Sequence, residues 1–520
     1  MNVNSKITGT FYTPLSLANY MIQYVFARHE IQTVLEPSVG NGIFLEGLTK
    51  QACAIDVVDI DHDALNEISV KCYQNVSIIN ENYLEYAYAC EKKYDLIIGN
   101  PPYVRKKYLS AHDREISRTL TDEYELSQTV FQNLWVSFIL CSLRLLKEEG
   151  TIFFVLPFEF LQVQYPCQLR GELEKRFNTI EIITFEKTPF PELEQDVCLV
   201  YLSNISKHDP EIKYKTVDSC EHFVPVKEGQ IKRNKPLSKW SNAILVDDEM
   251  DMVNRLSALY PTIASLGDTA PGIVTAANKF FILNKEKIHD LNCKEHILPI
   301  IKKSSYLRNL LIINEMDFKR LDEDSEDVWF LNLANKSEDQ FSSELNEYLL
   351  SDVTQNIKSG YKCRHRVKWF WVPVTQRGDL LFFKRYDMIP KLLVNSIDLY
   401  TTDLAYNVRI DKEKYDPNSV AFCFYNSLTL LCCEINGRFY GGGVGELTPT
   451  EFKSLPLPYQ KISKNDVEQL ESMFRKGTNY HEITNYVDSI VLKNLTSKEL
   501  ECLRSIRDTY LVRRIYQRRT

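Results

Sequence analysis

Short apolar segments alternate with helical segments from about residue 15 to residue 205, and this alternation limits the possible folds more than any other feature. It is typical of βαβ units around a mostly parallel sheet. The predicted strands are Thr33 to Leu35, Ala54 to Val58, Val76 to Ile79, Leu96 to Ile98, Ile152 to Leu156, Ile180 to Phe185 and Val197 to Leu202. We therefore predict an α/β fold with a doubly wound, Rossmann-like, mostly parallel sheet of seven strands.

Changes in composition divide the rest of the chain. Residues Leu134 to Leu146 predict a helix, which we expect to end in a charged turn at Lys147 to Gly150. The polar residues from about 205 to 245 favour a connection. We predict a first domain at 1–215, a mixed α+β domain at 240–460 and a helical C-terminal segment at 461–520.

Composition excludes several classes of protein. The longest apolar runs are too short to cross a bilayer, so we expect no membrane association. The thirteen cysteines form no CxxC pair and no zinc-like spacing, which favours a reduced, cytoplasmic protein without disulfides or a bound metal. Because the net charge is −8, any nucleic acid must bind at a local basic patch.

The turn after the fourth predicted strand is the strongest candidate for a catalytic site. It reads Asn100-Pro101-Pro102-Tyr103 and follows the apolar run that ends at Gly99. Two prolines fix the backbone and remove two donors, so the carbonyl oxygens are held in place. An amide, a fixed carbonyl and an aromatic ring can converge on a planar group that carries an amino nitrogen. The alternative is an ordinary turn at the end of a strand, with Tyr103 packed against it.

A glycine-containing loop follows the first predicted strand. Gly40 and Gly42 allow the backbone to approach a ligand closely, and Glu36 begins the loop. The loop lacks the GxGxxG pattern, and an acidic Glu36 would repel a pyrophosphate but suit a cationic ligand. About twenty residues later, Asp59 ends the next strand where an acid can accept hydrogen bonds from ribose hydroxyls. S-adenosylmethionine fits these features; the alternative is a loop with surface aspartates and no nucleoside.

With both motifs in place, residues 8 to 205 resemble the γ-class of adenine-N6 DNA methyltransferases of bacterial restriction-modification systems. Thr8 to Pro14 is similar to the family's N-terminal motif, Glu36 to Gly42 to its glycine loop, and Asn100 to Tyr103 to its (D/N/S)PP(Y/F) catalytic motif. The resemblance implies the following cofactor-binding residues: Tyr12, Thr13, Glu36, Pro37, Gly40, Gly42, Asp59, Ile60, Asn82 and Asn100.

Two positions need separate comment. Asn82 stands where the family often has an aspartate that binds the adenine amino group of the cofactor, although an amide oxygen can also accept that hydrogen bond. The segment Thr188 to Pro191 resembles the one whose aromatic residue packs against the flipped base. Phe190 is therefore predicted to stack on the base together with Tyr103, and its alternative role is core packing.

The resemblance implies methyl transfer from S-adenosylmethionine to N6 of an adenine that is flipped out of double-stranded DNA. The absence of a Pro-Cys catalytic loop argues against cytosine-C5 chemistry. The second half of the chain also resembles target-recognition regions, at Pro271 to Phe281, Arg438 to Val444 and Phe452 to Pro458. Predicted DNA contacts are Arg105, Lys106, Lys107, Lys362, Arg364, Arg366 and Lys368, although such charge runs also occur on solvated faces.

Other functions stay open at this point. Related turns occur in methyltransferases that modify RNA bases or the glutamine amide of a protein, and a catalytically inactive DNA-binding module is a further alternative. We expect a monomer that works beside a separately encoded restriction endonuclease, or an orphan methyltransferase as the second possibility. The methyltransferase pattern begins at residue 8, so we expect no nuclease domain before it.

Overall fold

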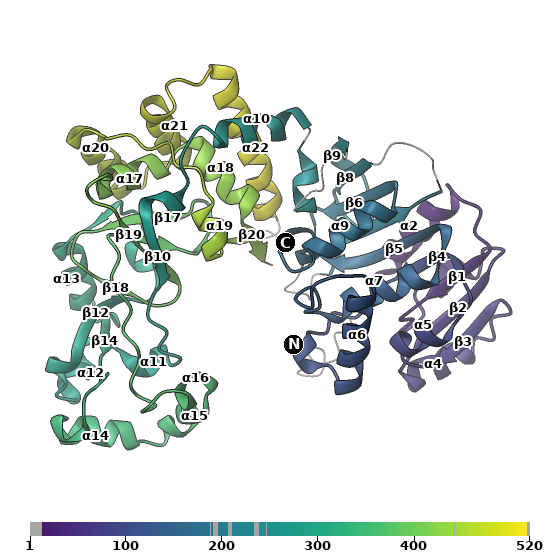
Figure 1. Cartoon of the computed structure of the whole chain (residues 1–520), viewed down its shortest axis with the longest axis horizontal. Coiled ribbons are helices and arrows are strands. Elements are labelled where there is room, and N and C mark those ends of the chain that lie inside the picture. Colours follow the sequence, from purple (N-terminus) through teal and green to yellow (C-terminus); the bar gives the residue numbers. More distant parts are fainter. Residues whose placement is uncertain are drawn as a thin grey trace. The chain divides into compact units, whose positions relative to one another are not determined.

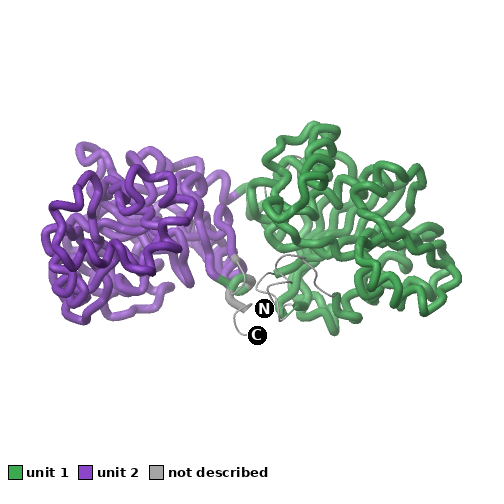
Figure 2. The backbone as a smooth tube through the Cα atoms, turned by 90° about the horizontal axis from the view of Figure 1, so that it is seen from below, with its two compact units in different colours: residues 1–251, 440–443, 512–520 green, residues 252–439, 444–511 purple. Residues whose placement is uncertain are grey.

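The computed structural model describes residues 13–187, 189–190, 196–205, 211–232, 239–245, 247–440 and 443–516. These residues form two compact units, which Figure 2 colours separately. Unit 1 consists of residues 1–251, 440–443 and 512–520, and unit 2 consists of residues 252–439 and 444–511. No helix among the described residues has the length and apolar character needed to cross a membrane.

A nine-stranded sheet forms the centre of unit 1, in the order β3-β2-β1-β4-β5-β7-β6-β8-β9 (Figure 1). Its strands are β1 (Thr33–Glu36), β2 (Ala54–Asp59), β3 (Val76–Asn80), β4 (Tyr94–Gly99), β5 (Leu146–Pro157), β6 (Thr179–Phe185), β7 (Val197–Ser203), β8 (Glu211–Val217) and β9 (Pro225–Lys232). Strands β1 to β5 pair in parallel, and β7 runs antiparallel to both β5 and β6. The predicted α/β class and all seven predicted strands are confirmed.

Helices connect these strands. They are α2 (Leu15–Phe26), α3 (Leu45–Leu48), α4 (His62–Ser69), α5 (Tyr83–Ala89), α6 (Ala111–Glu123), α7 (Leu134–Leu145), α8 (Glu159–Gln162), α9 (Cys167–Arg176) and α10 (Asp247–Ser257), with 3-10 turns at Lys106–Tyr108 and Trp240–Ile244. The apolar side of α2, including Leu17, Met21 and Val25, belongs to the same core cluster as Val34 of β1 and Leu96 of β4. Burial of this face fixes α2 against the sheet.

Two local predictions were wrong. The helix that was expected to end at Lys147 to Gly150 ends at Leu145 instead, and β5 begins at Leu146. Tyr94 of β4 pairs with Leu146 and Leu96 pairs with Thr151, so the residues that resemble a helix stop lie at a register irregularity inside β5. The polar segment expected to be a connection contains β8 and β9, which extend the sheet by two strands.

Unit 2 has a mixed α+β fold built on smaller sheets, as predicted for the second domain. Their orders are β10-β19-β15-β17-β13, β11-β14-β12-β18 and β16-β21-β20. The strands are β10 (Gly267–Pro271), β11 (Ile282–Leu283), β12 (Ile297–Ile301), β13 (Ile312–Ile313), β14 (Trp329–Leu331), β15 (Leu380–Phe383), β16 (Arg385–Tyr386), β17 (Lys391–Asn395), β18 (Tyr400–Thr401), β19 (Ala405–Ile410), β20 (Arg438–Tyr440) and β21 (Val444–Glu446).

The helices of this half are numerous and mostly short. They are α11 (Asn278–Phe281), α12 (Lys285–Asp290), α13 (Glu315–Glu323), α14 (Ser343–Leu350), α15 (Val353–Ser359), α16 (Tyr361–Arg364), α17 (Pro417–Phe424), α18 (Ser427–Asn436), α19 (Pro449–Lys453), α20 (Lys464–Arg475), α21 (Tyr480–Val491) and α22 (Ser497–Tyr516). Two apolar clusters pack beneath the sheets, one around Phe280 and Phe330 and the other around Leu381 and Leu393.

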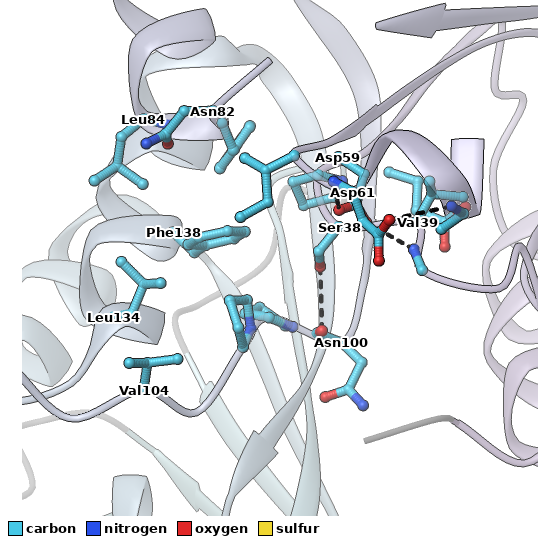
Figure 3. A pocket seen from close by; sticks show the side chains of 18 of the residues that line it. Ser38, Val39, Asp59, Asp61, Asn82, Leu84, Asn100, Val104, Leu134 and Phe138 are labelled. Atoms are coloured by element: carbon cyan, nitrogen blue, oxygen red, sulfur yellow. Dashed lines mark hydrogen bonds between the residues drawn. The ribbon is translucent and has the colours of Figure 1, made fainter. Parts of the chain in front are cut away.

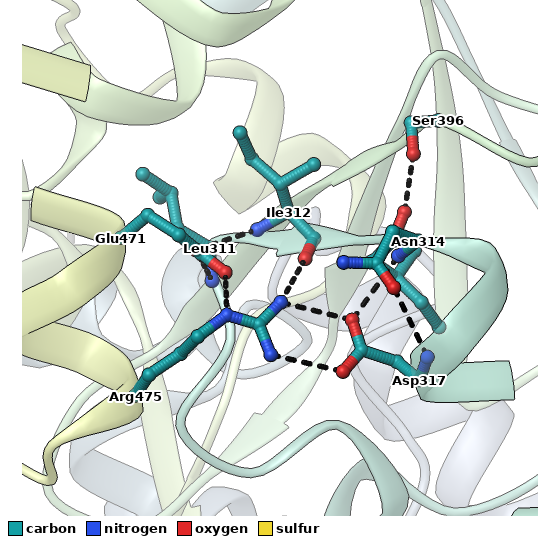
Figure 4. A network of polar contacts seen from close by, with 8 residues as sticks. Leu311, Ile312, Asn314, Asp317, Ser396, Glu471 and Arg475 are labelled. Carbon is teal, nitrogen blue, oxygen red and sulfur yellow. Dashed lines mark hydrogen bonds and ion pairs between the residues drawn. The ribbon is translucent and has the colours of Figure 1, made fainter. Parts of the chain in front are cut away.

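A polar network attaches α20 to the sheet part of unit 2 (Figure 4). Arg475 donates to both carboxylate oxygens of Asp317 on α13, at 2.9 Å each. Glu471 accepts the backbone N–H groups of Leu311 and Ile312 at 2.8 and 3.0 Å. Residues 444–511 belong to unit 2, and the domain boundaries expected from the sequence stay a prediction.

Candidate functional site

A cavity with a volume of about 400 Å³ lies in unit 1 at the carboxyl ends of β1, β2 and β4. Ligands of open α/β sheets bind at this edge, because the loops that follow parallel strands meet there. Figure 3 shows Ser38, Val39, Asp59 and Asp61 on one side of the cavity, and Leu84, Leu134 and Phe138 on the other. The cavity brings together the predicted glycine loop, the predicted acid and the predicted catalytic turn.

The loop after β1 depends on its two glycines. Gly40 and Gly42 have φ angles of 50° and 75°, in the left-handed region that side chains rarely adopt. A Cβ atom added to Gly42 would also come within 3.2 Å of Ile68. The glycines therefore let the loop turn tightly and present its backbone at the edge of the cavity.

Asp59 holds this loop in place. One of its carboxylate oxygens accepts the N–H of Gly40 at 2.8 Å, and the other accepts the N–H of Asp61 at 3.0 Å. Asp61 in turn caps α4 by accepting from Asp63 and Ala64. The acid predicted to bind ribose thus also fixes the two loops beside the cavity, and Ile60 next to it is 73% exposed and lines the cavity.

Glu36 is the most unusual carboxylate of the cavity. It is 1% exposed, and its Oε2 has no hydrogen-bond partner among the described residues. Burial raises the pKa of Glu36 well above its ordinary value, and the negative charge of Asp59 raises it further. A buried acid beside a second acid is a good partner for a positively charged ligand group.

The Asn-Pro-Pro-Tyr turn begins directly after β4 and is tied to the glycine loop. Ser38 of that loop donates its hydroxyl to the backbone carbonyl of Asn100 at 3.1 Å (Figure 3). The side-chain nitrogen of Asn100 donates to the hydroxyl of Thr13 at 3.2 Å, so the N-terminal segment orients the amide. Tyr12, the other residue predicted from that segment, lies outside the described residues.

Two aromatic residues were predicted to stack on a flipped base. Tyr103 is half-buried against the main core, and its hydroxyl donates to the carbonyl of Val155 at 3.2 Å. Burial raises the pKa of Tyr103 well above its ordinary value, so the ring stays neutral and fixed. Phe190 is 7% exposed and packs in the same cluster, and its stacking role stays a prediction.

The wall opposite the glycine loop contains residues that sequence patterns did not single out. Leu134 and Phe138 line the cavity from α7, together with Val104 and Leu84. Asp113 of α6 also lines it and accepts a hydrogen bond from Asn82. Nearly every face of α7 is buried, so its ligand-facing residues cannot be told from core residues by their spacing.

The basic residues after the catalytic turn differ in exposure. Arg105 and Lys107 are exposed, whereas Lys106 is half-buried with its ammonium 4.8 Å from the centre of the Phe131 ring. Burial lowers the pKa of Lys106, and Arg118 and Arg114 lower it further. Arg105 and Lys107 are thus the members of this group best placed to meet a phosphate.

The basic stretch, residues 361–369 of unit 2, divides in the same way. Lys362 and Arg364 are exposed on α16. Arg366 donates instead to the carbonyls of Val274 and Thr275 at 2.9 and 3.0 Å, and to that of Trp369 at 3.2 Å. It therefore joins α16 to the loop before α11. Lys368 pairs with Glu338 at 3.2 Å, so these last two basic residues have partners inside unit 2.

Two family models match the chain. Residues 43–190 match the Eco57I restriction-modification methylase, and residues 237–492 match the C-terminal domain of the type II methyltransferase M.Eco57I. The first match contains the catalytic turn and most of the cavity, and the second contains most of unit 2. The two matches thus lie on different units of the structure.

Curated relatives agree with the family models. The type II methyltransferase M.AccI of Acinetobacter calcoaceticus is 22% identical over 540 residues, covering 95% of this chain and 95% of its own. M.HincII of Haemophilus influenzae is 30% identical over 192 residues, which is 36% of each chain. The match to M.AccI therefore spans both units, whereas that to M.HincII is partial.

A solved structure shares the fold. The Type IIL restriction-modification enzyme MmeI, determined in complex with DNA, superposes with a TM-score of 0.57 at 12% identity. The superposition covers 93% of this chain and 73% of that chain. Since the family models match both units and M.AccI aligns with nearly the whole sequence, the chain belongs to the Eco57I family of type II restriction-modification methyltransferases.

Proposed function

We propose that the protein transfers a methyl group from S-adenosylmethionine to N6 of an adenine that has been flipped out of duplex DNA. One observation carries the proposal: the glycine loop and the Asn-Pro-Pro-Tyr turn line one cavity and are joined by the bond from Ser38 to the carbonyl of Asn100. A cofactor bound along the loop would meet a target base at the turn without rearrangement of the backbone between them.

The residues of the cavity fit this cofactor. Glu36 is buried, with a raised pKa and an oxygen that has no partner among the described residues, so a ligand ammonium would complete its hydrogen bonding. Within the described part of the chain each carboxylate oxygen of Asp59 accepts one backbone hydrogen bond, and a carboxylate has room for ribose hydroxyls as well. The apolar side chains of Leu84, Leu134 and Phe138 suit a planar ring.

Asn100 and Pro101 would act on the amino group of the target base. The bond from the Asn100 nitrogen to Thr13 orients the amide, so its oxygen is the end presented to an amino donor. The side-chain oxygen of Asn100 and the carbonyl of Pro101 accept the two amino hydrogens, which favours a pyramidal nitrogen with a directed lone pair. S-adenosylmethionine supplies an already activated methyl group, so positioning is the main task of these residues.

The target base must leave the helix to reach this turn, because N6 of a stacked adenine is inaccessible. Tyr103 would offer one ring face to the flipped base, and Phe190 would offer a second after moving out of the core. Arg105 and Lys107 would hold the neighbouring phosphates, and Lys362 and Arg364 would contribute to binding from unit 2. Arg366 and Lys368 are weaker candidates because each already has polar partners in the fold, and Lys106 is weaker because it is half-buried with a lowered pKa.

We further propose that the enzyme acts as a monomer and protects DNA against a separately encoded restriction endonuclease. All groups named for the chemistry come from one chain, so a second copy is not required. Its relatives M.AccI and M.HincII are named type II methyltransferases, which supports a role in protecting DNA.

The proposal is tested by incubating the purified full chain with S-adenosylmethionine and plasmid DNA, followed by single-molecule sequencing that distinguishes N6-methyladenine from methylated cytosines. We expect methylated adenines at one short sequence. Methylated cytosines alone would contradict the assignment of the base, and methylated RNA or protein with unmodified DNA would contradict the substrate. An assay of wild-type protein without cofactor is the control.

A further inference from the structure

The cofactor cavity has a polar pair at its far wall, Asn82 and Asp113, and the role predicted for Asn82 alone does not account for Asp113. Asn82 is the N-cap of α5, and Asp113 lies in the first turn of α6. Both line the cavity. Resting on the proposed use of S-adenosylmethionine, we propose that Asp113 accepts a hydrogen bond from the exocyclic amino group of the cofactor's adenine, and that Asn82 positions the Asp113 carboxylate.

The direction of the hydrogen bonds gives the two residues different tasks. The side-chain oxygen of Asn82 accepts the N–H of Leu84 at 2.9 Å, which caps α5. The side-chain nitrogen of Asn82 donates to Oδ1 of Asp113 at 2.7 Å. The cap fixes the orientation of the amide, so Asn82 turns its donor side toward Asp113 and has its acceptor side engaged with the backbone.

Asp113 retains capacity to accept. Its Oδ2 accepts the hydroxyl of Ser110 at 2.6 Å, and its Oδ1 accepts only from Asn82 in the described structure. A carboxylate has about four acceptor positions, so roughly two of them are available to a ligand. The bonds from Ser110 and Asn82 hold the carboxylate from two sides and fix its direction without saturating it.

The side chains around Asp113 suit a planar ligand ring that carries a hydrogen-bond donor at its edge. Figure 3 shows Leu84, Phe138 and Leu134 along the wall on which Asn82 lies. Apolar side chains can cover the faces of a purine, and Asp113 adds a charged acceptor to the same part of the lining. A hydrogen bond from an amino group to a carboxylate is about twice as strong as one to a neutral amide. An adenine is thus preferred to a purine with an oxygen at this position, which the carboxylate would repel.

Ligand discrimination tests the assignment. The affinities of S-adenosylhomocysteine and S-inosylhomocysteine, which carries an oxygen in place of the amino group, are measured for the full chain by calorimetry. We expect the wild type to prefer S-adenosylhomocysteine by about tenfold to hundredfold, because the hydrogen bond involves a charged group. In Asp113→Asn the preference should fall to within about threefold, because an amide can donate to the oxygen or accept from the amino group.

Matched variants separate this contact from general effects of charge. Glu81→Gln removes a carboxylate from the same cavity, and Glu115→Gln removes an exposed one from the same helix. Both should keep the wild-type ratio of affinities, even if Glu81→Gln weakens the two ligands equally.

The outcomes distinguish the inference from the proposed function. A wild type that binds neither ligand would overturn the proposed function together with this inference. A wild type that binds both ligands equally, or an unchanged ratio in Asp113→Asn, would overturn the inference alone. Equal binding of the two ligands by the wild type would overturn the inference even if a variant folds poorly, and melting curves of each variant show whether its fold is retained.

Discussion

The cavity of unit 1 and the basic stretch of unit 2 differ in how their residues are positioned. In the cavity, Glu36, Asp59 and Asn100 each lie at or directly after the carboxyl end of a parallel strand. In the basic stretch, the side chains lie on a helix of four residues and the loop after it, and Arg366 links them to another loop through backbone carbonyls. Pairing of the parallel strands therefore positions the cavity residues. The basic stretch is instead held in position by the hydrogen bonds of one side chain, that of Arg366.

Residues of the same chemical type therefore have different tasks in the two regions. A polar residue at a strand end is free to face a ligand because the backbone already holds it in place. In a loop without regular pairing, some polar residues must replace the missing backbone hydrogen bonds. Arg364 and Arg366 are two residues apart, yet one is exposed and the other is bonded to three carbonyls.

The largest expected effect lies in the cavity. Asn100→Ala should lower methyl transfer by at least about 10³-fold, because it removes an acceptor that acts on the reacting nitrogen. Binding of S-adenosylhomocysteine should change by less than about threefold, since Ser38 bonds to the backbone of residue 100 and that bond remains. Methylation assays and calorimetry measure the two quantities. Asn66→Ala on the exposed side of α4 is the control, and full activity of Asn100→Ala would refute its catalytic role.

In the basic stretch the largest effect should be on stability. Arg366→Ala leaves the carbonyls of Val274, Thr275 and Trp369 without this donor, so we expect the free energy of unfolding to fall by about 2 kcal/mol. Denaturant unfolding followed by tryptophan fluorescence measures the change, because Trp369 lies beside the site. Unchanged stability with a selective loss of DNA binding would show that Arg366 contacts DNA and does not stabilise the fold of unit 2.

Glu36→Gln separates ligand binding from stability within the cavity. Its affinity for S-adenosylhomocysteine should fall about tenfold, because the variant loses a charged partner for the ligand's ammonium. The ligand-free variant should nevertheless melt at a higher temperature than the wild type at pH 8. Calorimetry and thermal melting of both proteins measure these effects, with Glu46→Gln on the exposed side of α3 as the control.

The sign of the stability effect follows from the raised pKa of Glu36. Burial favours the protonated carboxyl, so the stability that this group contributes is present below the ordinary pKa of 4.5 and is lost as the pH rises through the raised pKa of the folded state. Glutamine carries no charge at any pH. The advantage of the variant should therefore vanish near pH 4 and grow as the pH rises, and a constant difference would contradict the assignment.

The smallest effect is expected at Arg364. Arg364→Ala removes an exposed cation from α16, so stability should stay within about 0.5 kcal/mol of wild type. If Arg364 contacts a phosphate, a plot of log affinity for duplex DNA against log salt concentration should become less steep by about one unit in the variant. Fluorescence anisotropy across salt concentrations measures the slope. Lys319→Ala on α13 is the control, and an equal slope in both variants would exclude a phosphate contact at Arg364.

Much of unit 1 was predictable because its signals are local. An apolar run that ends in Asn-Pro-Pro-Tyr specifies a strand followed by a rigid turn, whatever surrounds it. The end of α7 was not predictable from the same kind of signal, because β5 already pairs with β4 at Leu146, before the residues that resemble a helix stop at Lys147 to Gly150. Strand β8 did carry a usable signal, since Ile212 and Tyr214 alternate with charged residues along it.

The far wall of the cavity depends on contacts between distant segments. Nothing near Asp113 in the sequence marks it as a partner of Asn82, because 31 residues separate them. Phe138 and Leu134 resemble the other buried residues of α7. In unit 2, Arg366 resembles Arg364 until the loop at Val274, 92 residues away, provides the carbonyl that it binds.

Local sequence was enough to identify the order of the strands in the chain, the glycine loop, the acid that ends β2 and the Asn-Pro-Pro-Tyr turn, because each depends on neighbouring residues and backbone chemistry. Contacts in the folded chain were needed to show that β8 and β9 extend the sheet, that Asp113 meets Asn82 in the cavity and that Arg366 serves the fold of unit 2. These results depend on which distant groups come within hydrogen-bonding distance. That choice follows from packing of the whole chain and leaves no local pattern in the sequence.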